Sequence, residues 1–153
     1  VMRKILGTNM NVSSIQKVEH NRFARADLEY RLLMVDDDMK LEAVPAYNTT
    51  PGRDKFHPKG RDNGYILTLG GTRIYIAGDT EDIPELNQMK DIDIAFLPVN
   101  QPYTMTPEQA IRAAKIIKPR VLYPYHYGET DIHKVKDGLK NETGTEVRIR
   151  ALQ

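Results

Sequence analysis

Apolar and polar residues alternate along much of the first two-thirds of the chain, which is the pattern of strands with one buried face. This alternation predicts two hairpins, with strands over residues 29–35 and 40–46 and over residues 65–69 and 73–77. The first connection is Asp36-Asp37-Asp38, and the second is Gly70-Gly71, which supplies the positive φ angles of a tight hairpin turn. Residues 47–63, between the hairpins, are predicted to form a long loop, a feature that is usually functional or disordered in a compact domain.

From residue 92 onward, continuous apolar runs alternate with segments of helical periodicity. The pattern predicts strands over 92–99, 120–125 and 146–152, helices over 106–118 and 131–141, and a short helical stretch over 84–89. In the helix over 106–118, Thr106 is a good N-cap, Pro107 suits the first turn and Gln109 completes a capping box. Alternating strands and helices indicate a layered α/β fold. Residues 1–28 show no clear apolar face, and we assign them no structure.

The composition narrows the class of protein. The chain has 153 residues, which suits one domain, and we predict a single domain over residues 1–153. The charges nearly cancel, with 22 Lys and Arg against 21 Asp and Glu, which argues against nucleic-acid binding. The absence of cysteine excludes a disulfide scaffold and a cysteine nucleophile. No apolar run approaches the roughly 20 residues that span a bilayer, so we expect no membrane segment and a cytoplasmic protein.

Two predicted strands end in residues that can carry chemistry. Asp79 follows the strand over 73–77, and His126 follows the strand over 120–125. We expect both at one edge of the sheet, near the point where the loop that contains His57 returns. Carboxylate and imidazole groups are ligands that Zn, Mn and Fe accept. Each residue also has an ordinary explanation, because Asp79 can cap the next helix and His126 can be a packing residue.

A series of short motifs, taken in order, carries a more specific signal than either residue alone. They are residues 42–48 (Glu-Ala-Val-Pro-Ala-Tyr-Asn), 56–60 (Phe-His-Pro-Lys-Gly), 77–80 (Ala-Gly-Asp-Thr), 102–106 (Pro-Tyr-Thr-Met-Thr) and 124–128 (Pro-Tyr-His-Tyr-Gly). In this order they resemble the C-terminal half of metallo-β-lactamase-fold hydrolases, in particular an uncharacterised bacterial branch of Zn-dependent hydrolases. The resemblance covers about residues 29–150. It implies an α/β fold that is half of, or a shortened form of, an αββα sandwich.

The resemblance also implies roles for individual residues. In that superfamily the residue at Asp79 bridges two metal ions and the residue at His126 binds the second. Asn48 stands where relatives carry a further histidine, and His57 is a candidate replacement ligand. The implied cofactor is a divalent metal, Zn first and Mn or Fe next. Metal-activated water would hydrolyse an ester, lactone, amide or phosphodiester of a small-molecule substrate. The side chains that we expect near such a substrate are Asn48, Tyr47, Tyr103 and Tyr127.

One departure from the family pattern leaves alternatives open. The primary His-x-His-x-Asp-His metal motif is absent, since the chain has no His-x-His pair. A hydrolase site would therefore be incomplete in this chain, with a second copy or an N-terminal half supplying the rest. The main alternative is a non-catalytic, truncated or degenerate domain that acts in binding or oligomerisation. The third is an ordinary α/β domain in which Asp79 and His126 only cap and pack.

Overall fold

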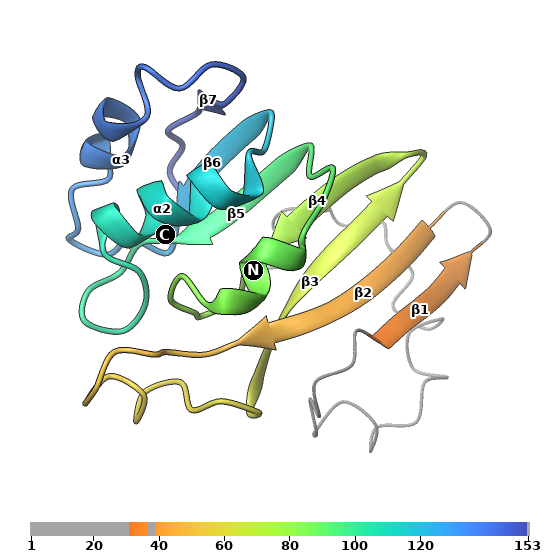
Figure 1. Cartoon of the computed structure of the whole chain (residues 1–153), viewed down its shortest axis with the longest axis horizontal. Helices are drawn as coiled ribbons and strands as arrows, with labels where there is room; N and C mark the ends of the chain where they lie inside the picture. The colour runs from red at the N-terminus through yellow and green to blue at the C-terminus, as the bar shows by residue number, and fades with distance from the viewer. Residues whose placement is uncertain (1–30, 37–38, 153) are drawn as a thin grey trace.

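The fold is one mixed sheet of seven strands whose spatial order follows the order of the chain (Figure 1). The computed structural model describes residues 31–36 and 39–152. The strands are β1 (Arg31–Asp36), β2 (Met39–Ala46), β3 (Asp62–Leu69), β4 (Thr72–Ile76), β5 (Ile94–Pro98), β6 (Val121–Tyr125) and β7 (Glu146–Val147). The helices are the 3₁₀ helix η2 (Pro84–Gln88) and the α-helices α2 (Pro107–Ile117) and α3 (His133–Gly138).

The connections decide the direction of each strand. β1 to β4 pair antiparallel, which confirms both predicted hairpins. The connection within each hairpin is short, whereas the loop over residues 47–61 joins β2 to β3. In the second hairpin Gly70 and Gly71 have φ angles of +50° and +84°. β4, β5, β6 and β7 pair parallel, and helical crossovers connect them. The carboxyl ends of β4, β5 and β6 therefore lie at one edge of the sheet, which we call the site edge.

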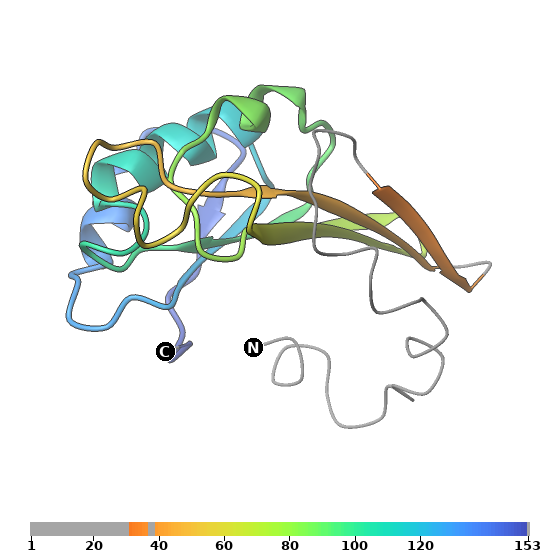
Figure 2. The same ribbon diagram turned by 90° about the horizontal axis from the view of Figure 1, so that it is seen from below.

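The main core lies between the sheet and the helices η2, α2 and α3, which share one face of it (Figure 2). Helix α2 has the predicted capping box between Thr106 and Gln109 and ends at Lys118 in the left-handed conformation. Its buried side follows the helical period, with Ala110, Ala113, Ala114 and Ile117. Burial of this stripe holds α2 against the sheet.

The opposite face of the sheet carries a second, smaller apolar cluster. Ile76, Phe96 and Tyr125 are buried there, and Tyr123 stacks on Phe96 with ring centroids 5.0 Å apart. These residues alternate with those that face the helices, as the period of a strand requires. Within the described residues no helix covers this face. The described fold is therefore a sheet with one helical layer, the arrangement of half an αββα sandwich.

Several predicted elements are shorter than expected. The strand predicted over 92–99 is β5, Ile94–Pro98. The helix predicted over 131–141 is α3, His133–Gly138, because Asp131 accepts a hydrogen bond from His133 N just outside it. The strand predicted over 146–152 is only Glu146–Val147. Arg148 N still donates to Leu122 O, but the chain then leaves β6. The prediction for residues 1–28 lies outside the described residues. None of the described helices has the length and apolar composition of a membrane span.

Candidate functional site

Asp79 and His126 meet across the end of a strand to which neither belongs. Asp79 follows β4 and His126 follows β6, so β5 lies between them. Strands separated by one neighbour are about 10 Å apart. Nevertheless Asp79 Oδ1 and His126 Nδ1 are 2.9 Å apart. The two side chains must therefore bridge the carboxyl end of β5. The prediction that both residues lie at one edge is confirmed.

Two glycines allow the chain to turn tightly at Asp79. A Cβ atom at Gly64 would lie 2.5 Å from the Ala77 carbonyl oxygen. Gly78 has a φ of +67°, and a Cβ there would lie 2.7 Å from Asn63 O. The start of β3 thus lies against the turn that presents Asp79. Any side chain at either glycine would push this turn outward.

The backbone at His126 is held in a conformation that non-glycine residues rarely adopt. His126 has a φ of +46°, and its N–H donates to Leu152 O at 2.8 Å. The preceding Tyr125 donates its hydroxyl to Gly78 O at 3.3 Å. Burial raises the pKa of Tyr125 well above its usual range, and the Asp79 charge adds to this, so the hydroxyl stays a donor. These bonds fix the His126 turn relative to the Asp79 turn.

His57 approaches the same carboxylate from the long loop. Its Nε2 is 3.8 Å from Asp79 Oδ2, and its Nδ1 is 3.0 Å from Asp62 Oδ2. Arg61 binds Asp62 with Nη2 and Oδ2 2.7 Å apart, and this hydrogen bond holds the pKa of Asp62 below its usual range. Metal-binding histidines usually donate their second nitrogen to such a carboxylate. Asp62 was not among the candidate residues named from the sequence. An acidic residue that follows a candidate histidine within a few positions is the signal that could have identified it.

A buried carboxylate fixes the loop over residues 47–61. Glu81 Oε2 accepts hydrogen bonds from Thr49 N at 2.8 Å and Thr50 N at 2.7 Å, and also from both threonine hydroxyls. Arg53 Nη1 lies 3.0 Å from Glu81 Oε1. Burial raises the pKa of Glu81, but the four hydrogen bonds outweigh it and the pKa is lowered. The carboxylate therefore stays charged and binds the loop to the segment that follows Asp79.

The same loop is tied to the chain after β5. Arg53 donates to Pro102 O at 2.7 Å and also to Thr104 O. Asn48 donates from Nδ2 to Tyr103 O at 2.7 Å, while its backbone N–H donates to His57 O at 2.8 Å. The segments that follow β2, β4 and β5 consequently form one hydrogen-bonded unit around His57.

The residues predicted near a substrate divide into two kinds. Tyr47 and Asn48 are buried; the Tyr47 hydroxyl binds Glu85 at 2.9 Å, and Asn48 Oδ1 has no hydrogen-bond partner among the described residues. Tyr103 is 46% exposed and packs edge-to-face on Phe56. Tyr127 is half-buried, with its hydroxyl donating to Arg150 O at 3.3 Å. Only Tyr103 and Tyr127 are accessible to a ligand without rearrangement.

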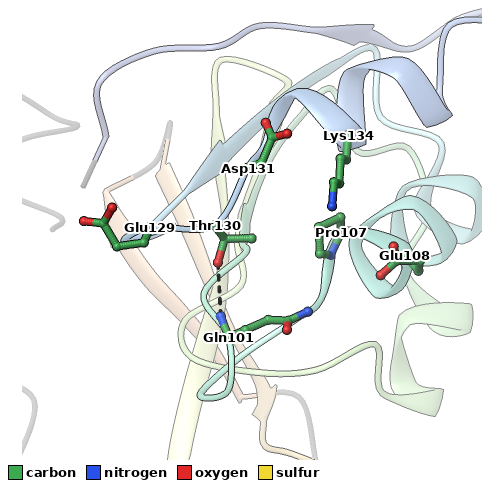
Figure 3. Close-up of a pocket in the computed structure, with 7 residues that line it drawn as sticks. All are labelled: Gln101, Pro107, Glu108, Glu129, Thr130, Asp131 and Lys134. Atoms are coloured by element: carbon green, nitrogen blue, oxygen red, sulfur yellow. Dashed lines mark hydrogen bonds between the residues drawn. The ribbon is translucent and has the colours of Figure 1, made fainter.

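A cavity of about 290 Å³ opens beside the loops that follow β5 and β6 (Figure 3). Two of its lining residues are joined by a hydrogen bond, from Gln101 N to Thr130 Oγ1 at 3.3 Å. In Figure 3 the Lys134 ammonium points toward Pro107, and the Glu129 carboxylate points away from the other lining groups. The cavity is lined by Gln101, Pro107, Glu108, Glu129, Thr130, Asp131 and Lys134. Its lining is mainly polar, so it suits a polar ligand.

The side chains around Asp79 fit a metal ion in type but do not complete a site. The bond lengths of tetrahedral zinc place its ligand atoms about 3.3 Å apart, and the two pairs above lie at 2.9 and 3.8 Å. Each Asp79 oxygen faces a different imidazole. In the described part of the chain, however, no group of three or more His, Asp or Glu is arranged to hold a metal ion alone. Nor does Asp79 cap η2, which has no side-chain cap.

The sheet, its single helical layer and its loop-rich edge define the metallo-β-lactamase type of fold. A metallo-β-lactamase fold protein of Bacillus subtilis superposes with a TM-score of 0.60 at 14% identity, covering 80% of this chain and 50% of that one. Residues 11–126 match the β-lactamase superfamily domain, and the chain belongs to this family.

Two relatives are more similar in sequence. A Pelotomaculum thermopropionicum protein named UPF0173 metal-dependent hydrolase is 30% identical over 124 residues, which are 74% of this chain and 54% of that protein. A Parabacteroides distasonis crystal structure, named as a candidate metal-dependent hydrolase, is 64% identical with a TM-score of 0.78. It covers 82% of this chain and 56% of its own. The chain thus spans about half the length of these relatives.

Proposed function

We propose that this chain carries part of the active site of a metal-dependent hydrolase. The observation that carries the proposal is the Asp79 carboxylate, which has His126 at one oxygen and His57 at the other. Asp62 behind His57 supports it, because a second carboxylate sets the orientation and basicity of a ligating imidazole. The names of the relatives, metal-dependent hydrolases, agree with this chemistry.

In this proposal Asp79, His126 and His57 hold a divalent metal, with Zn first and Mn or Fe next. When bound, such an ion polarises a substrate oxygen and lowers the pKa of bound water. The substrate is a small molecule with an ester, lactone, amide or phosphodiester bond. Tyr103 and Tyr127 contact it. Tyr47 and Asn48, by contrast, hold the loop that carries His57.

The domain organisation belongs to the same proposal. Residues 1–153 form a single domain, of which residues 29–153 correspond to the C-terminal half of the relatives. Further ligands then come from an N-terminal half or from a second copy of the chain. A non-catalytic domain that binds a partner or oligomerises is the second candidate, favoured by the incomplete donor set among the described residues.

Elemental analysis of the purified chain, after loading with Zn, Mn or Fe, separates the two candidates. We expect bound metal in the wild type, its loss in Asp79→Asn, and its retention in Asp93→Asn, a matched change at the opposite edge. Hydrolysis of p-nitrophenyl acetate and bis(p-nitrophenyl) phosphate should follow the metal. Equal metal content in wild type and Asp79→Asn would refute the ligand role. Metal without hydrolysis, together with a dimer in light scattering, would favour the binding domain.

A further inference from the structure

The residue that follows β5 occupies the middle of the site edge. The Asp79–His126 pair bridges the carboxyl end of β5, and the chain there continues through Val99 and Asn100. Val99 is fully buried, whereas Asn100 is half-buried. Asn100 is therefore the first partly accessible side chain between the strands that supply the pair.

The backbone of Asn100 is held firmly. Its carbonyl oxygen accepts hydrogen bonds from Tyr103 N at 2.9 Å and Thr104 N at 2.7 Å, and its N–H donates to Thr104 Oγ1 at 2.8 Å. Arg53 in turn binds Thr104 O. The side-chain amide of Asn100, in contrast, makes no hydrogen bond to any residue in the described ranges. A fixed backbone with an unpaired polar end is what a ligand-binding position needs.

The Asn100 amide lies against a glycine that leaves room for it. A Cβ atom at Gly128 would be 3.1 Å from Asn100 Oδ1 and 3.6 Å from Nδ2. Gly128 stands between His126 and Glu129, which lines the cavity, while Asn100 directly precedes Gln101 on the opposite wall. The contact of Asn100 with Gly128 thus marks the border between the Asp79–His126 pair and the cavity of Figure 3.

We propose that Asn100 is a substrate-orienting residue whose Nδ2 group donates a hydrogen bond to the carbonyl or phosphoryl oxygen of the substrate. The polar remainder of the substrate would then occupy the cavity between Gln101 and Lys134. This inference rests on the proposed hydrolase function. The physical reason is that a donor held in place before binding stabilises the charge that grows on that oxygen, and does so without reorganisation.

The test compares Asn100→Ala with Asn141→Ala, a matched change at an exposed asparagine between α3 and β7. With metal-loaded protein and the two p-nitrophenyl substrates, Asn100→Ala should lower kcat by about 100-fold, the usual effect of one lost oxyanion donor. Metal content should not change. Asn100→Asp, which has a similar shape but no donor, should lose more activity on the anionic phosphodiester than on the neutral ester. Asn141→Ala should match the wild type.

A second readout does not depend on activity. The side-chain amide resonances of Asn100, assigned by their loss in Asn100→Asp, should shift when dimethyl phosphate or acetate is added. Active wild type with unchanged kcat in both Asn100 variants would overturn the inference and leave the hydrolase proposal intact. If the wild type hydrolyses neither substrate, the hydrolase proposal fails. The amide resonances then test the role of Asn100 by themselves. If neither ligand shifts them, that role is overturned.

Discussion

The two ends of strands β4, β5 and β6 contrast sharply. At the opposite edge, where these strands begin, the turn Gly70-Gly71 is tight and the ion pair Asp93–Arg120 is on the surface, with Arg120 75% exposed. At the site edge the connections are long, and a fully buried Glu81 sits among them. The left-handed His126 lies there as well.

The contrast shows that the buried polar interactions of this fold are concentrated at the site edge. At the opposite edge the strands satisfy most of their backbone through the ladder, and partly exposed side chains add single bonds, such as Asp93 accepting from Arg73 N at 2.8 Å. The irregular loop over 47–61 has no such ladder, so side chains bind its backbone: Glu81 accepts from the Thr49 and Thr50 amides, and Asn48 Nδ2 donates to Arg53 O. This network keeps His57 beside Asp79. Changes at the site edge are therefore expected to cost more than changes at the opposite edge.

The largest effect is expected from Glu81→Ala. Removal of the carboxylate leaves the Thr49 and Thr50 amides unpaired and Arg53 without its counter-ion, so the free energy of unfolding should fall by about 3 kcal/mol. Urea denaturation measures it. A loss no greater than that of Arg120→Ala, at the opposite edge, would show that the buried network contributes no more than a surface pair.

Gly64→Ala should rank next. Its Cβ would press on the Ala77 carbonyl oxygen at 2.5 Å, and such overpacking costs about 2 kcal/mol. The matched change is Gly70→Ala, where nothing lies within 4 Å and only the φ of +50° is unfavourable. Thermal unfolding of both variants checks the order. Equal losses would mean that the start of β3 can move away from the Asp79 turn.

Asp62→Asn probes the support of His57 rather than the fold. Without this carboxylate the imidazole should be less basic and less well oriented, which lowers metal affinity by about 10- to 100-fold. Metal titration by calorimetry gives the change, with Asp54→Asn, in the loop that carries His57, as a control. Unchanged affinity in Asp62→Asn would remove His57 from the proposed ligand set.

A smaller effect should appear only in acid. Because the pKa of Glu81 lies below its ordinary value of 4.5 in the folded chain, the unfolded chain takes up the proton more readily. The stabilisation is complete above that ordinary value and decreases as the pH falls below it. In urea denaturation, the difference between wild type and Glu81→Gln should therefore shrink toward low pH. A difference in the free energy of unfolding that does not change with pH would contradict the lowered pKa of Glu81.

The smallest effect is expected for Arg120→Ala. Its ion pair with Asp93, 2.9 Å long, is exposed to solvent, and such pairs contribute less than about 1 kcal/mol. Salt should weaken even this contribution. Denaturation at low and high ionic strength tests both points. A loss as large as that of Glu81→Ala would erase the distinction between the two edges.

Much of the fold follows from local signals that the sequence displays directly. The two hairpins and the helix from Thr106 were predicted because alternation, the Gly-Gly turn and the capping box act between near neighbours. The last strand was predicted too long, since the chain leaves β6 after Val147 although β6 itself continues to Tyr125. The residues that pair with this strand are distant from it in the sequence, so a local pattern does not show where the pairing ends.

The sequence alone placed Asp79 and His126 at strand ends, and the motif order pointed to the family. It also named His57, without a means to decide whether the loop brings it close. The tertiary structure decided that the pair spans β5, and that Asp62 stands behind His57. It also showed that the Asn100 amide, which bonds to none of the described residues, lies between the pair and the cavity. Strand identity is encoded over a few residues, whereas contacts between loops depend on the packing of the whole sheet edge.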